Sequence, residues 1–203
     1  MTAALAASLA LAGLVAGRGL RSVIARYATP PPFAVEAVTA LALAALALRV
    51  HPGLVLAAAC WLAGCAIPLA FIDAAARRLP DLLTIPAYAG TVLLLVAAAA
   101  ATGDWHDLLR AGLGGLAAAG FFLVLAVVSR AGMGLGDVKA AASLGTLLAW
   151  RGWSTLLAGT FAGFLLAAVY GIALLLAGRA TRKQHIPFGP FLIIGAFAAI
   201  LAW

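Results

Sequence analysis

Long apolar stretches follow one another along the whole chain and are separated only by short segments that contain proline, glycine or charged residues. A helix that crosses a bilayer needs about 20 apolar residues, and the mean hydropathy of this 203-residue chain is +1.16. Only 9% of its residues are charged, compared with about 25% in soluble domains. We therefore expect an all-α integral membrane protein that forms a single polytopic domain over residues 1–203.

Eight apolar runs define the expected transmembrane helices. They span about residues 3–20, 33–49, 53–72, 84–101, 108–129, 138–150, 153–177 and 187–203. The sixth run has 13 residues, which is fewer than the minimum of about 17 for a span. Three alternatives stay open for this run: little tilt, a start before Asp137, or an incomplete crossing.

Lysine and arginine residues alternate in number between successive loops. The loops after the first, third, fifth and seventh runs carry ten of the 13 cations, and the remaining three follow the second, fourth and sixth runs. Cytoplasmic loops are enriched in Lys and Arg, so this pattern predicts cytoplasmic odd-numbered loops and both termini outside. The cations occur singly or in pairs, and the net charge of +7 therefore forms no basic patch for nucleic acid.

The few carboxylates are candidates for function because an ionisable group near hydrocarbon is costly. Asp104 and Asp107 belong to a predicted outer loop, whereas the other four acidic residues map to the cytoplasmic side. Asp73 ends the third run and Asp137 opens the sixth, so both lie at the same predicted membrane boundary. Two neighbouring carboxylates can act as general base and general acid on a water molecule. This arrangement predicts aspartyl-protease chemistry at Asp73 and Asp137.

Further candidates for substrate binding surround the two aspartates. Gly134 and Gly136 lack a Cβ atom and would let a substrate backbone approach closely. Lys139, Asp81 and Glu36 are also assigned to substrate binding, each with an alternative. Lys139 could stabilise the second aspartate or only follow the positive-inside rule, Asp81 suits a helix N-cap, and Glu36 could pair with an arginine of an inner loop. The three histidines fall in separate loops, so no metal site is expected.

Two motifs carry a family resemblance. Residues 134–139 read Gly-Leu-Gly-Asp-Val-Lys, residues 79–84 read Leu-Pro-Asp-Leu-Leu-Thr, and the two aspartates are separated by 137 − 73 = 64 positions. These segments resemble the prepilin peptidases, the Gly-x-Gly-Asp class of membrane aspartyl proteases, and residues 13–26, 32–36 and 186–190 are similar to three helix segments of that family.

The resemblance implies an endopeptidase of the cytoplasmic (inner) membrane with Asp73 and Asp137 as its catalytic pair. Its implied substrates are type IV prepilin-like or pseudopilin proteins, whose basic leader would be removed at the cytoplasmic face without a metal or organic cofactor. Bifunctional members carry two Cys-x-x-Cys pairs and an N-methyltransferase activity between their first two helices. Here that connection comprises only residues 27–32, which implies a compact member that is a peptidase alone.

Two other functions stay open from the sequence. An intramembrane aspartyl protease that cuts other helices would place its aspartates deeper within the spans. A small proton- or cation-coupled transporter could use Asp73, Asp137 and Glu36 as carriers. Transporters commonly contain internal repeats, and the sequence shows no convincing repeat.

Overall fold

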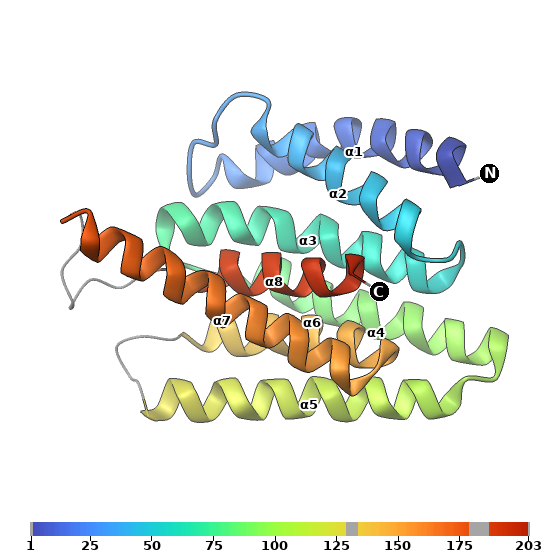
Figure 1. The fold of residues 1–203 in the computed structure, drawn as a ribbon. Helices are drawn as coiled ribbons and strands as arrows, with labels where there is room; N and C mark the ends of the chain where they lie inside the picture. Colours follow the sequence, from blue (N-terminus) through green and yellow to red (C-terminus); the bar gives the residue numbers. More distant parts are fainter. Residues whose placement is uncertain (1, 129–133, 179–186, 203) are drawn as a thin grey trace.

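The computed structural model describes residues 2–128, 134–178 and 187–202. Within these ranges the chain forms an α-helical bundle (Figure 1). Its helices are α1 (Thr2–Ile24), α2 (Ala34–Arg49), α3 (Leu54–Ala76), α4 (Asp81–Thr102), α5 (Trp105–Val128), α6 (Leu135–Arg151), α7 (Trp153–Leu176) and α8 (Gly189–Leu201). Each of the eight predicted apolar runs therefore corresponds to one helix.

Five helices, α1, α3, α4, α5 and α7, are long and apolar enough to cross a membrane. These helices identify the chain as a multi-pass membrane protein. The other three helices are shorter, with 16 residues in α2, 17 in α6 and 13 in α8. The number of helices that cross the bilayer and the side on which each end lies stay predictions.

The helix boundaries correct the sequence interpretation at two places. Helix α6 begins at Leu135, three residues before the predicted start, which is one of the alternatives left open for this run. Helix α1 continues to Ile24, so Arg18 and Arg21 lie inside the helix and not in a loop. Arginine is a good helix former, and these two residues extend the helix beyond its apolar part.

Successive helices run in opposite directions (Figure 1). The C-termini of α1, α3, α5 and α7 therefore lie at one end of the bundle with the N-termini of α2, α4, α6 and α8. We call this the aspartate end because it contains Asp73 and Asp137, and we call the other the opposite end. Four cations of the predicted cytoplasmic loops lie outside the described residues: Arg130, Arg179, Arg182 and Lys183.

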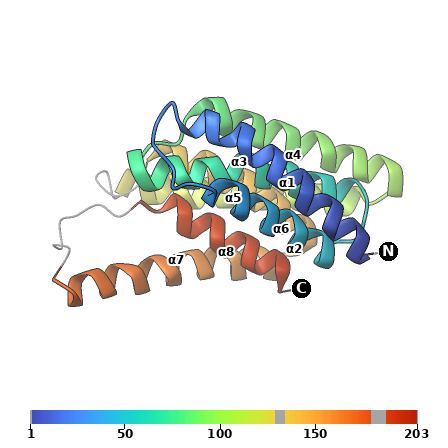
Figure 2. The same cartoon turned by 90° about the horizontal axis from the view of Figure 1, so that it is seen from above.

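Helix α3 is the central element of the bundle. It packs against α1, α2, α4, α6 and α8, and Figure 2 shows α4 along one edge of the bundle and α7 along the other. Small residues permit close helix packing in lipid: a Cβ atom at Gly145 of α6 would lie 2.6 Å from the Cβ of Ala118 in α5. This close packing fixes the position of α6 and of the aspartate in its first turn.

A small apolar cluster attaches the α1–α2 pair to α3 at the aspartate end. Ile24, Val35 and Ile72 are fully buried against one another, and Leu83 of α4 packs against them. Ile72 immediately precedes Asp73 in α3. The cluster therefore supports the last turn of α3 from the side of α1 and α2.

Candidate active site

Asp73 and Asp137 come together at the aspartate end of the bundle. Asp73 lies in the last turn of α3 and Asp137 in the first turn of α6, which contact each other. The residues are 6% and 8% exposed, respectively, and their carboxylates are close enough to interact electrostatically. Two buried carboxylates in one place are costly to ionise together. The pair is therefore the strongest candidate for acid–base chemistry in the described chain.

The backbone of α8 holds the Asp73 side chain. Gly189 is the first residue of α8, and its N–H donates a hydrogen bond of 3.0 Å to Asp73 Oδ2. The first N–H groups of a helix have no partner within the helix, and the positive end of the helix dipole favours a negative charge. Asp73 therefore caps the N-terminus of α8 from a different helix.

The position of Gly189 leaves no room for a side chain. A Cβ atom at this residue would lie 2.7 Å from Asp73 Oδ2 and 3.2 Å from Asp73 Cγ. In the sequence, Gly189 falls within residues 186–190, which resemble the start of the family's last helix, but no role at the site was predicted for it. The available signal was a glycine beside Pro190 at a helix start, where an N–H is free to serve another group.

Asp137 is held by the start of its own helix. It is the third residue of α6, and its Oδ2 accepts a 3.0 Å hydrogen bond from the N–H of Gly134, the N-cap residue. This is the bond by which an acidic side chain in the first turn satisfies the N-cap amide. Like Asp73, Asp137 is therefore oriented by a backbone amide at a helix N-terminus.

Each carboxylate has one oxygen left for chemistry. Oδ2 accepts the amide hydrogen bond in both Asp73 and Asp137, and neither Oδ1 accepts a hydrogen bond from the part of the chain that the structure describes. Oδ1 of each residue therefore keeps its capacity to accept a proton or a hydrogen bond from a water molecule or a substrate group. Such a pair can hold one proton and polarise a water molecule between its members.

An ion pair joins α4 to α6 beside the aspartates. Lys139 Nζ lies 2.5 Å from Asp81 Oδ1, and no ion pair of Lys139 with Asp137 is present among the described residues. The predicted role of Asp81 as an N-cap is wrong, because Pro80 occupies the N-cap position of α4. As the first residue of α4, Asp81 instead pairs with Lys139 of α6.

The second glycine of the Gly-x-Gly-Asp motif serves packing within the chain. A Cβ atom at Gly136 would lie 2.6 Å from Leu79 Cβ, so the absence of a side chain lets the segment before α4 rest on the first turn of α6. Gly134 is exposed and lies at the N-cap position. The Lys139–Asp81 pair and the Leu79–Gly136 contact together form a clasp between the two aspartate motifs.

Glu36 lies in the α1–α2 pair and does not join the two aspartates. Arg21 donates hydrogen bonds from Nε to Glu36 Oε1 at 2.8 Å and from Nη2 to Glu36 Oε2 at 2.5 Å. The pairing of Glu36 with an arginine, one of its two expected roles, is therefore present, although Arg21 lies in α1. Bidentate pairs of this kind fix geometry as well as charge. Among the described residues, the ion-pair partner of Glu36 is therefore Arg21 and not a residue of the aspartate pair.

Comparison with known proteins identifies a family and relatives that resemble the part of the chain with the two aspartates. Residues 56–176 match the model of the type IV leader peptidase family, and this range contains both aspartates. The chain is 34% identical over 175 residues to the prepilin leader peptidase/N-methyltransferase of Aeromonas salmonicida (strain A449). The aligned segment covers 82% of this chain and 56% of the relative. The chain thus spans little more than half the length of that relative.

Two further relatives match shorter segments. The prepilin leader peptidase/N-methyltransferase of Bacillus subtilis (strain 168) is 40% identical over 92 residues, 45% of this chain and 36% of the relative. The leader peptidase HopD of Salmonella typhimurium is 41% identical over 73 residues, 36% of this chain and 44% of the relative. No solved structure matches the chain. The family match, together with the curated relatives, establishes that this chain belongs to the type IV leader peptidase family.

Proposed function

We propose that this protein is a membrane aspartyl endopeptidase that removes the basic leader peptide of type IV prepilin-like or pseudopilin substrates. The observation that carries the proposal is the burial of Asp73 and Asp137 at the same end of the bundle, on the contacting helices α3 and α6. Membership of the type IV leader peptidase family supports the reaction class. The relatives are prepilin leader peptidases and a leader peptidase, which supplies the substrate class, and the family favours a peptidase over a transporter.

The reaction follows from the two free carboxylate oxygens. One aspartate, ionised, takes a proton from a water molecule, and the resulting hydroxide attacks the carbonyl carbon of the scissile peptide bond. The other aspartate, protonated, first donates a hydrogen bond to the carbonyl oxygen and then gives a proton to the leaving amine as the C–N bond breaks. The amides of Gly134 and Gly189 hold the two carboxylates in place during these transfers.

The position of the aspartates along their helices favours cleavage at the membrane boundary. Asp73 lies three residues before the end of α3, and Asp137 two residues after the start of α6. A leader peptide is polar and is followed by an apolar helix, so the bond between them lies where the membrane ends. An enzyme that cuts within other helices would place its carboxylates near the middle of its spans.

We further propose that the aspartate end faces the cytoplasm. In the sequence, ten of the 13 cations lie in or near the segments that join α1 to α2, α3 to α4, α5 to α6 and α7 to α8, in accord with the positive-inside rule. Single cysteines at Ala76 and Thr102, in a background without Cys60 and Cys65, test this orientation. In intact cells an impermeant thiol reagent should label position 102 only, and permeabilisation should expose position 76. Labelling of position 76 from outside would refute the proposed orientation.

We also propose that the protein cleaves its substrate without methylating it. Only nine residues, 25–33, connect α1 to α2, which is too short for the cysteine-bearing segment associated with methyl transfer in bifunctional members. Mass spectrometry of the cleaved product, made with S-adenosylmethionine present, should therefore show an unmodified new N-terminus. A stoichiometric gain of one methyl group would contradict this proposal.

Amide substitution of each aspartate tests the proposed catalysis. Asp73→Asn and Asp137→Asn keep the size of the side chain and an oxygen that can accept the amide hydrogen bond, but they remove the acid–base function. Loss of a general acid or base costs about 10²–10⁴ in rate. We expect each variant to lose activity by this factor in a detergent assay with a prepilin-like substrate, while its helix content and elution volume stay those of the wild type.

The matched control is Asp104→Asn, which removes a carboxylate from an exposed residue at the opposite end of the bundle. This variant should keep the wild-type rate. A folded Asp73→Asn or Asp137→Asn variant with more than about a tenth of the wild-type rate would exclude the proposed pair, given the expected loss.

A further inference from the structure

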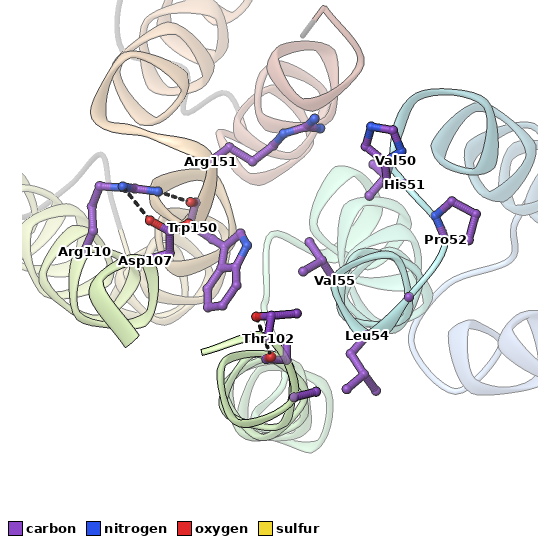
Figure 3. A pocket seen from close by; sticks show the side chains of 13 residues that line it. Val50, His51, Pro52, Leu54, Val55, Thr102, Asp107, Arg110, Trp150 and Arg151 are labelled. Atoms are coloured by element: carbon purple, nitrogen blue, oxygen red, sulfur yellow. Dashed lines mark hydrogen bonds and ion pairs between the residues drawn. The ribbon is translucent and has the colours of Figure 1, made fainter. Parts of the chain in front are cut away.

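A cavity of about 560 Å³ lies at the opposite end of the bundle, away from the aspartates (Figure 3). Its walls come from five places: the connection between α2 and α3, the first turn of α3, the end of α4, the start of α5 and the last turn of α6. The volume is within the range of about 300–1,000 Å³ for small-molecule sites. The proposed peptidase reaction does not use this cavity.

One of the two arginines in the cavity wall is already fully engaged. Arg110 forms an ion pair of 2.9 Å with Asp107. Its guanidinium group also donates hydrogen bonds to the backbone carbonyls of Ala149, at 2.7 Å, and Trp150. These bonds satisfy carbonyl groups at the C-terminus of α6 that have no partner within the helix. Arg110 and Asp107 therefore form a neutral part of the wall.

The second arginine keeps most of its hydrogen-bonding capacity. Arg151 Nη1 donates one long hydrogen bond of 3.3 Å to the carbonyl of Ile200, and its guanidinium group makes no ion pair with the described residues. His51, an exposed residue of the α2–α3 connection, extends toward Arg151 from the other side of the cavity (Figure 3). Among the described residues that line the cavity, the only acidic one is Asp107, which pairs with Arg110, so Arg151 gives the mouth of the cavity a positive charge.

The remaining walls are apolar. Val55 of α3, Ala98 and Ala101 of α4 and the indole of Trp150 line the cavity below its charged mouth. A ligand that fits both parts combines an anionic group with an apolar body. The cavity lies where helices end, which for membrane-crossing helices is the level of the lipid headgroups, and an arginine at this level can form charge-assisted hydrogen bonds to a lipid phosphate group.

We propose that this cavity binds an anionic phospholipid. The phosphate group accepts hydrogen bonds from Arg151 and His51, and the glycerol and the first part of an acyl chain lie against Trp150 and Val55. The bound lipid connects the three turns that join α2 to α3, α4 to α5 and α6 to α7. This site is independent of the aspartate pair and does not rest on the proposed peptidase activity.

Native mass spectrometry of the full-length protein, with phosphatidylglycerol or phosphatidylcholine added, tests the site. The wild type should retain phosphatidylglycerol more strongly than the zwitterionic lipid. Arg151→Gln should weaken the retention of phosphatidylglycerol by at least about tenfold, which corresponds to about 1.4 kcal/mol, because it removes a charged hydrogen-bond donor. Arg151→Lys keeps the charge and should keep most of the binding.

Two further variants distinguish binding in the cavity from nonspecific attraction of lipid to charges at this end of the bundle. Ala101→Phe fills the apolar part from an exposed helix position and should also weaken retention. Arg49→Gln removes an exposed charge at the same end of the bundle, outside the cavity wall, and should change nothing. Wild-type retention of phosphatidylglycerol by both Arg151→Gln and Ala101→Phe would overturn the proposal, and so would equal retention of the two lipids by the wild type.

Competition with inorganic phosphate distinguishes the headgroup from the whole lipid. Displacement of phosphatidylglycerol by phosphate alone would support a site in which Arg151 and His51 supply the affinity. Retention in the presence of phosphate, with continued dependence on Arg151 and Ala101, would support recognition of the complete lipid. Retention in phosphate without dependence on either residue would refute the site.

Discussion

Substitution of Gly189 by alanine tests whether the start of α8 positions Asp73. In the wild type the Gly189 N–H donates a 3.0 Å hydrogen bond to Asp73 Oδ2 in a buried environment. The added methyl group would lie 2.7 Å from that same oxygen, which is closer than carbon and oxygen atoms approach without a bond. The Asp73 side chain or the first turn of α8 must therefore shift, and the hydrogen bond lengthens or breaks.

The expected effect is mainly on catalysis. A hydrogen bond to a charged group contributes about 1.5–3 kcal/mol, and a displacement of about 1 Å in an active site can cost about 10² in rate. We therefore expect Gly189→Ala to lower kcat by about 30- to 100-fold. KM should change by less than about threefold, because the methyl group lies against Asp73 and carries no charge that would alter substrate association.

Steady-state cleavage of a prepilin-like substrate in detergent separates kcat from KM, and thermal unfolding reports the stability of the variant. The matched control is Gly64→Ala in α3, the same helix that carries Asp73, since no atom lies within 4 Å of a Cβ added at Gly64. This control should keep wild-type activity. If a folded Gly189→Ala variant keeps more than about half of the wild-type kcat, the reasoning about Asp73 is refuted, because the expected loss is far larger.

The clasp between the two aspartate motifs makes two further predictions. Asp81→Lys or Lys139→Asp alone should lower activity, whereas the double exchange should restore most of it. The loss from breaking the exposed pair should not exceed about fivefold, since such pairs contribute about 0.2–1 kcal/mol. Equal activity in the wild type, the two single variants and the double variant would refute a role for the pair. Gly136→Ala should lower both activity and the unfolding temperature, because the added methyl group would clash with Leu79. Leu79→Ala should relieve both effects in the double variant, and a lack of rescue would contradict the proposed contact.

Hydropathy predicted the number of helices but not where the functional ones begin. Each predicted apolar run corresponds to a helix, because burial in lipid requires long apolar stretches. The sixth apolar run begins three residues after the start of α6 because Gly136 and Asp137 interrupt the apolar pattern, and the start before Asp137 was only one of three alternatives left open. Helix termini use polar residues and glycine to satisfy free N–H groups. Hydropathy therefore loses its signal at the ends of helices, where this site is built.

The sequence also did not predict which residues far apart in the chain contact each other at the site. Asp73 and Asp137 could be placed at one boundary because each ends or begins an apolar run. The partner of Asp73 could not be inferred in this way, since Gly189 is 116 residues away. The local sequence around each of these residues gives no indication of the other. The Lys139–Asp81 pair was missed for the same reason: a separation of 58 residues left the nearer N-cap role as the better prediction for Asp81.

The two aspartates share one structural device that explains how a buried carboxylate pair can exist at this place. Each is held at the N-terminus of a helix: Asp137 at its own helix, α6, and Asp73 at α8. Both receive an amide N–H together with the positive end of a helix dipole, which offsets part of the cost of burying a negative charge. Since one of the two helices is α8, the site extends beyond the family-matched residues 56–176. The last helix therefore contributes its backbone to the proposed active site, even though none of its side chains takes part in the proposed proton transfers.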